Sequence, residues 1–97
     1  MTDPMRVVLG EGRTADRVVF PPAAGNLVGE TAGFLVTHPG ADGQPCLGPS
    51  GHFIPTHPES PVRWTIESMI PLTLSPSLAC RVCGDHGFIR DGRWVPA

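Results

Sequence analysis

Residues 80–94 read CRVCGDHGFIRDGRW, and this stretch contains the two local patterns on which the fold prediction rests. Cys80 and Cys83 are separated by two residues and followed by glycine, a spacing at which two thiolates can bind one metal ion. Further on, Asp91 and Gly92 separate two short apolar runs, and this dipeptide tolerates the positive φ angles of a type I′ turn. The stretch therefore predicts a metal-binding knuckle followed by a C-terminal β-hairpin.

The predicted hairpin has one strand over residues 88–90 and a second over residues 93–95. In a two-residue hairpin these strands pair directly, so Ile89 and Trp94 would lie opposite each other on one face. We expect that face to be part of the core.

The rest of the chain has the sequence pattern of an antiparallel all-β protein, because short apolar runs alternate with Gly- and Pro-rich breaks. The expected strands are residues 5–9, 17–20, 33–37, 52–54 and 62–67. Residues 38–51 read as a long polar loop. Ser75 followed by Pro76 resembles an N-cap with proline at the first helical position, which predicts one helical turn there.

The size and composition indicate one small domain that needs support from outside its core. The chain has 97 residues, of which 12 are Gly and 12 are Pro. Domains below about 70–80 residues commonly need metals or disulfides, and this chain is only somewhat longer. We expect a single domain over residues 1–97, with N-terminal strands and a loop in 1–32 and a zinc-stabilised β core in 33–97.

Zinc is the expected ion, and it requires four ligands in a tetrahedron. Cys80 and Cys83 supply two of these ligands. The third cysteine of the chain, Cys46, lies in the long polar loop, and a metal ligand there would hold the loop in one conformation. Buried free thiols and redox chemistry are the alternatives. The redox alternative is disfavoured because no βαβ pattern surrounds the Cys-x-x-Cys.

The fourth ligand is expected to be a histidine. His38 begins the same Gly- and Pro-rich loop that contains Cys46, so both ends of that loop could curl onto one ion. His86 is the main alternative, because it follows the Cys-x-x-Cys closely and would complete the site locally. His52, His57 and water are the remaining alternatives.

One enzyme class shares part of this pattern. Zinc nucleobase deaminases carry H-x-E and then P-C-x-x-C, and here His57 and Glu59 precede the cysteine pair. However, Ala79 and not proline precedes Cys80, and three prolines between residues 55 and 61 oppose the helix that carries H-x-E in those enzymes. We therefore expect no enzyme, with a zinc hydrolase or deaminase-like activity as the least favoured alternative.

The charge and the opening residues bear on partners and location. The net charge of −2 argues against nonspecific nucleic-acid binding. The sequence starts with MTDPMRVV, which lacks a basic region followed by an apolar one, so we expect no secretion signal. No apolar run approaches the roughly 18 residues of a membrane span, so we expect no membrane association.

The run PLTLSPSLACRVCGDHGFIRDGRWVPA, with HPG…C and RWTIES ahead of it, resembles a group of small uncharacterised proteins of actinobacteria and their phages. The likeness extends from Gly33 onward. In that group a His or Cys in the loop and a lone Cys precede the terminal Cys-x-x-Cys, which implies that His38 and Cys46 are ligands. The resemblance carries no activity, and it implies a phage or prophage origin.

These observations predict a mostly β, loop-rich fold with a small antiparallel sheet, a zinc-ribbon-like knuckle and a C-terminal hairpin. The expected zinc ligands are His38, Cys46, Cys80 and Cys83. The expected function is a non-enzymatic, zinc-stabilised interaction module that binds a host or phage protein. The alternative is a small structural protein of the virion. The expected location is accordingly the cytoplasm of the host cell or the virion.

Overall fold

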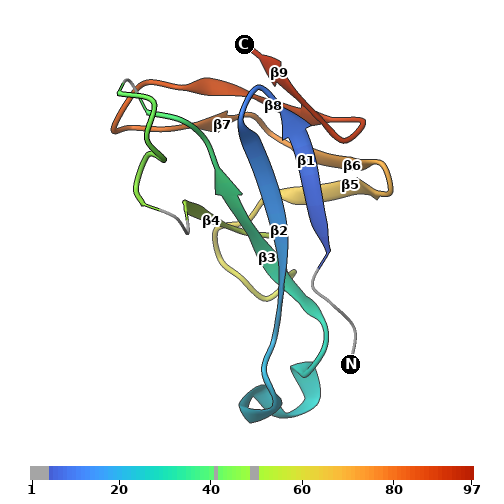
Figure 1. Ribbon diagram of the computed structural model, residues 1–97. Coiled ribbons are helices and arrows are strands. Elements are labelled where there is room, and N and C mark those ends of the chain that lie inside the picture. The colour runs from blue at the N-terminus through green and yellow to red at the C-terminus, as the bar shows by residue number, and fades with distance from the viewer. Residues whose placement is uncertain (1–4, 41, 49–50) are drawn as a thin grey trace.

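The described part of the chain consists of antiparallel β-strands and one short 3-10 helix, as a computed structural model shows for residues 5–40, 42–48 and 51–97 (Figure 1). The elements are β1 (Arg6–Gly10), β2 (Arg13–Val19), η1 (Pro22–Leu27), β3 (Thr31–Thr37), β4 (His52–Pro55), β5 (Thr65–Met69), β6 (Leu72–Ser75), β7 (Leu78–Ala79), β8 (His86–Arg90) and β9 (Arg93–Pro96). The prediction of a mostly β, antiparallel and loop-rich fold is confirmed.

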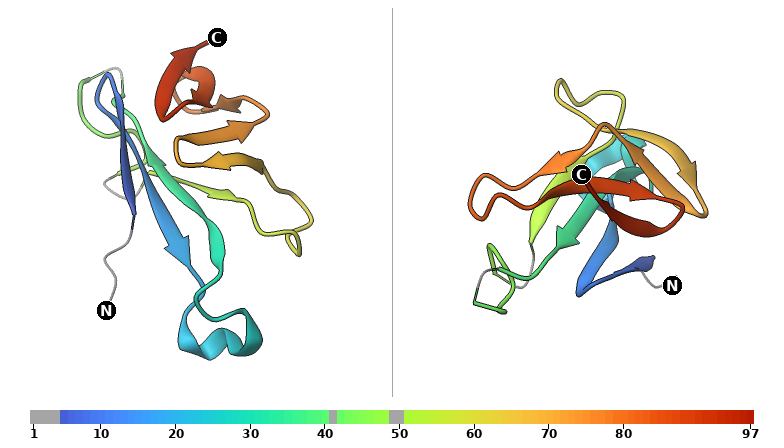
Figure 2. Two further views of the ribbon diagram at one scale, coloured as in Figure 1. Left: turned by 90° about the vertical axis from the view of Figure 1, so that its right-hand side faces the viewer. Right: turned by 90° about the horizontal axis from the view of Figure 1, so that it is seen from above.

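The strands form two layers. One layer is a four-stranded sheet with the order β1-β2-β3-β4. The other layer contains the β5-β6 hairpin and the three-stranded sheet β7-β8-β9, with β6 in contact with β8. The left view of Figure 2 shows the two layers edge-on, with the N-terminal strands on one side and the C-terminal strands on the other.

The core lies between these layers and takes side chains from both. Its buried members are Leu9, Ala15, Phe34, Val36 and Ile54 from the first layer and Leu72, Leu74, Leu78, Ile89 and Trp94 from the second. Every strand except β5 contributes at least one of these side chains, and β5 adds the partly buried Ile66 and Met69. Because the core is shared in this way, neither layer has a buried core of its own.

The C-terminal hairpin has the predicted register. Ile89 pairs with Trp94, and both side chains are buried. Asp91 has φ 52° and Gly92 has φ 73°, so both turn residues adopt the positive φ angles that a type I′ turn requires. The pattern in the sequence was sufficient here because the turn chemistry fixes the pairing.

Two local predictions were wrong. The helical turn expected after Ser75 does not form, because Ser75 ends strand β6 and Leu78–Ala79 is strand β7, paired with β8. Leu72 and Leu74 alternate with polar residues and are 1% and 2% exposed, so burial of this period-two pattern outweighs the local capping signal. The strand expected from Val62 starts only at Thr65, and Val62 is 70% exposed.

Strands β2 and β3 begin earlier in the chain than the sequence indicated. β2 begins at Arg13, although a strand was expected only from Arg17, because β2 pairs with β1 on one side and β3 on the other. The expected boundary between residues 32 and 33 falls inside β3, which pairs with β2. The first four residues of the expected domain lie outside the described residues.

Gly87 provides a test of the hairpin packing, because the Trp94 ring lies directly against it. A Cβ atom at Gly87 would lie 2.5 Å from Cζ2 of Trp94 and 2.7 Å from the carbonyl oxygen of Val95. We expect Gly87→Ala to lower the free energy of unfolding by about 1–3 kcal/mol through overpacking, measured by urea denaturation. The control is Gly29→Asn, at a φ of 82° with no atom within 4 Å of a Cβ, where asparagine should cost less than about 1 kcal/mol. Equal stabilities of the two variants would contradict this packing.

Candidate metal centre

The first half of the centre comes from the loop after β3. His38 follows the last residue of β3. The backbone N–H of Cys46 donates to the carbonyl oxygen of His38 at 2.9 Å, which holds Cys46 beside His38. Within the loop, the N–H of Gly40 donates to the carbonyl oxygen of Gln44 at 2.7 Å. The loop therefore folds back on itself, and both of its ends present a side chain at one place.

The second half is the knuckle between β7 and β8. The N–H of Gly84 donates to the carbonyl oxygen of Cys80 at 2.9 Å, and the N–H of Cys80 donates to the carbonyl oxygen of Asp85 at 2.7 Å. Gly84 has φ 78°, which a residue without a side chain adopts at little cost. This tight turn brings the Cys83 side chain back beside that of Cys80.

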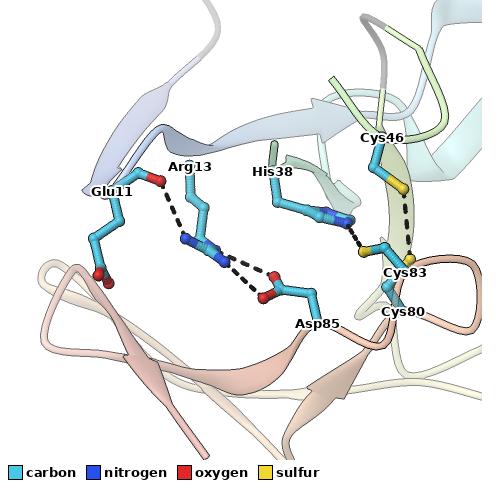
Figure 3. A network of polar contacts seen from close by, with 7 residues as sticks. All are labelled: Glu11, Arg13, His38, Cys46, Cys80, Cys83 and Asp85. Carbon is cyan, nitrogen blue, oxygen red and sulfur yellow. Dashed lines mark hydrogen bonds and ion pairs between the residues drawn. The ribbon is translucent and has the colours of Figure 1, made fainter. Parts of the chain in front are cut away.

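Four donor atoms meet where the two halves face each other (Figure 3). The donors of His38, Cys46, Cys80 and Cys83, called here the His/Cys cluster, all lie within 4.8 Å of one another. Three of these residues are buried and Cys83 is exposed. The residues predicted as ligands from the sequence are thus brought together, two from each layer, and they could hold one metal ion.

The distances within the His/Cys cluster fit a tetrahedral ion better than a bond between cysteines. Cys46 Sγ and Cys80 Sγ are 3.7 Å apart, and His38 Nε2 is 3.3 Å from Cys83 Sγ. Tetrahedral zinc with ordinary bond lengths would place two sulfurs about 3.8 Å apart and a nitrogen and a sulfur about 3.6 Å apart. A disulfide requires about 2.05 Å, and all three cysteines are free.

The environment acts differently on the two buried thiols. Burial, together with the neighbouring thiols of Cys80 and Cys83, raises the pKa of Cys46 to about 11. Burial also acts against the charged form of Cys80, but the backbone N–H groups of Cys83 and Val82 point at this sulfur and lower its pKa below the usual value. Cys80 therefore already has the hydrogen-bond donors that stabilise a thiolate.

The imidazole of His38 is held in the neutral form that binds metals. Burial lowers the pKa of His38, and the nearby Asp85 opposes this only in part. The ring also stacks on His52, with 5.0 Å between the ring centroids and 20° between the planes. A neutral, fixed imidazole offers the lone pair of one nitrogen to an ion.

The other candidate histidines lie elsewhere. His86 is exposed, and its Nε2 is 2.9 Å from the hydroxyl oxygen of Ser77. His57 pairs with Glu30, with 3.1 Å between Nε2 and Oε1. His52 contacts the His/Cys cluster through its stacking on His38, but its nitrogens are not among the clustered donors.

Sequence reasoning missed the ion pair that supports the knuckle. Arg13 Nη2 lies 2.6 Å from Asp85 Oδ1, and Arg13 Nε donates to Asp85 Oδ2 at 3.3 Å (Figure 3). Arg13 also donates to the carbonyl oxygen of Glu11 and lies 4.7 Å above the ring of Trp94. This ion pair fastens β2 to the residue that receives the Cys80 N–H bond. The two residues are 72 positions apart, and no local pattern in the sequence connects them.

Comparisons with known proteins do not extend this description. No protein-family model matches the chain, and no curated protein or solved structure matches it either. The resemblance to small actinobacterial and phage proteins accordingly stays a prediction. In the described residues, no helix is long and apolar enough to cross a membrane.

The assignment of the fourth ligand can be tested on the zinc-loaded protein. We expect X-ray absorption to find three sulfurs at about 2.3 Å and one nitrogen at about 2.0–2.1 Å from the ion. His38→Ala should remove the nitrogen contribution and weaken zinc binding, whereas His86→Ala should leave both unchanged. The opposite result for the two variants would assign the fourth position to His86.

The raised pKa of Cys46 predicts how zinc binding depends on pH. At pH 7 this thiol carries its proton in the metal-free protein, since its pKa is about 11, and it must lose the proton to bind zinc. Zinc binding should therefore release protons, and the affinity should fall about ten-fold per pH unit for each proton released as the pH decreases. Calorimetry in buffers of different ionisation enthalpy measures the release. Cys46→Ser should release at least one proton fewer, and an unchanged count would contradict the assignment.

Proposed function

We propose that the protein is a non-enzymatic interaction module whose β fold is stabilised by a structural zinc ion in the His/Cys cluster. The observation that carries this proposal is the convergence of four protein donors, two from the β3–β4 loop and two from the β7–β8 knuckle. An ion bound there would join the two layers through its coordination bonds to the four side chains. The link would lie at the edge of a core that both layers share.

The donor set supports zinc over other ions. Three thiols and one imidazole form a soft set of the Cys3His type, which is common in structural zinc sites. Calcium and magnesium prefer carboxylate, carbonyl and water oxygens, and the cluster offers none of these. A tetrahedral arrangement of sulfur and nitrogen is the geometry that zinc adopts in such sites.

The same donor set supports a structural role and opposes a catalytic one. Catalytic zinc keeps one position open for water or substrate, whereas structural zinc has four protein ligands. Here four side chains would occupy all positions of the tetrahedron. The zinc ion would therefore serve folding, and the partner would bind elsewhere on the protein.

A protein is the partner that we propose, and the resemblance to phage proteins suggests a host or phage protein. The net charge of −2 offers little attraction to nucleic acid. A β framework whose layers are joined by a metal ion is suited to holding a binding site in one conformation. This lowers the entropic cost of association.

Removal of the metal tests the structural role. Structural zinc in small peptides contributes about 10 kcal/mol or more at pH 7, and 1 kcal/mol corresponds to about 4–8 °C in a domain of this size. We expect a strong chelator to lower the melting temperature by more than about 20 °C or to abolish cooperative unfolding. Cys46→Ser should behave similarly, and His86→Ala should stay within a few degrees of the unaltered protein. An unmoved melting curve after verified zinc removal would refute the structural role.

A further inference from the structure

Cys83 is the one donor of the His/Cys cluster that is exposed. Residues 81–84, which form the tip of the knuckle, are all exposed, and Val82 beside Cys83 is 67% exposed. Cys46 and Cys80 are both buried. A small reagent dissolved in water therefore reaches the sulfur of Cys83 before it reaches either of the other two sulfurs.

Cys80 lies on the same turn as Cys83, with its sulfur nearby. The Sγ atoms of both belong to the His/Cys cluster, whose donors lie within 4.8 Å of one another (Figure 3). The hydrogen bond from the N–H of Gly84 to the carbonyl oxygen of Cys80 closes the turn at 2.9 Å. A disulfide requires about 4.4–6.8 Å between its two Cα atoms, a span found across the four residues of a turn. A disulfide between Cys80 and Cys83 therefore fits the knuckle.

Cys46 is the third thiol of the chain, and it reaches the knuckle from the other layer. Its Sγ is 3.7 Å from that of Cys80, but the two residues are 34 positions apart in the chain. Cys80 and Cys83 are only three positions apart. Closing the short loop costs less conformational entropy than closing the long one, and it does not require the two layers to stay together. The structure therefore favours Cys80 as the thiol that pairs with Cys83.

We propose that Cys83 is a site of oxidation, at which hydrogen peroxide converts Cys83 and Cys80 into a disulfide and the zinc ion is released. The inference deepens the proposed function and rests on it, because it names a chemical signal that would regulate the His/Cys cluster. The exposed sulfur is the point of attack, and the neighbouring sulfur on the same turn completes the reaction.

The reaction is balanced in atoms and electrons. The Cys83 thiolate attacks one oxygen of the peroxide, so that an S–O bond forms, the O–O bond breaks and hydroxide leaves. The Cys80 thiolate then attacks the sulfur of this sulfenic acid, so that an S–S bond forms, the S–O bond breaks and a second hydroxide leaves. Two thiolates thus lose two electrons in total, and one hydrogen peroxide is reduced to two hydroxide ions.

Loss of these two thiolates removes half of the zinc site. His38 and Cys46 remain as donors, whereas a structural zinc ion requires four protein ligands. The ion would leave, and the two layers would lose the bonds that it forms between them. A dithiol reductant would reverse the change, because thiol–disulfide exchange regenerates both thiols.

The test uses the full zinc-loaded chain and hydrogen peroxide, with a chromogenic zinc indicator that follows the release of the ion. Arg63 and Arg81 separate the three cysteines, so trypsin places each cysteine in its own peptide and mass spectrometry identifies the disulfide directly. We expect one zinc ion to be released for each disulfide formed, with Cys80 joined to Cys83 and Cys46 still open to alkylation. A dithiol reductant with added zinc should restore the melting temperature.

Two matched variants locate the point of attack. Cys83→His and Cys46→His each replace one thiol by an imidazole, so both offer the Cys2His2 set that structural zinc also uses. Cys46→His retains the reacting pair and should release zinc at about the rate of the unaltered chain. Cys83→His leaves only the two buried thiols, which react after local opening, so its release should be at least about ten-fold slower.

Three outcomes would overturn the inference. These are retention of zinc under peroxide, a disulfide that contains Cys46, and equal release rates for the two variants. The disulfide map of the unaltered chain decides the matter even where a variant fails to bind zinc. The zinc content before peroxide is added tests the proposed function separately, since a chain that holds zinc and keeps it under peroxide would refute the oxidation site alone.

Discussion

The constraint on which the structure depends is the meeting of three sulfurs and one imidazole nitrogen within 4.8 Å. Uncoordinated thiols form only weak hydrogen bonds, and burial opposes their ionisation, as the pKa of Cys46 near 11 shows. A divalent ion would reverse this balance, because it favours the thiolate at every cysteine at once. The loop after β3 and the knuckle after β7 would then be held by bonds much stronger than the contacts around them.

Contacts around the His/Cys cluster connect it to the strands at both ends of the chain. The Arg13–Asp85 ion pair joins β2 to the knuckle, and the Arg13 guanidinium lies over Trp94 of the last strand. Trp94 in turn covers Gly87 and completes the shared core. Strands from both ends of the chain are therefore linked to the His/Cys cluster through Asp85, whose backbone carbonyl oxygen accepts the N–H of Cys80.

The sequence predicted best where one short pattern fixes the geometry. Asp91 and Gly92 define a turn and hence a register, and the Cys-x-x-Cys defines the knuckle. The pairing of His38 with this knuckle could be proposed because His38 begins the loop that contains Cys46. The Arg13–Asp85 ion pair could not be predicted, because it depends on how two distant segments pack. At β6 a capping signal competed with alternating leucines, and burial decided the outcome.

The unequal burial of the four donors has a kinetic consequence. Cys83 is exposed whereas the other three donors are buried, so solvent and small competing chelators reach the cluster from one side. Exchange of an ion would start by detachment at Cys83, with the remaining donors still holding it. The rate of exchange would then depend on this one thiolate, and the ion could be slow to leave even where a competitor binds it more tightly.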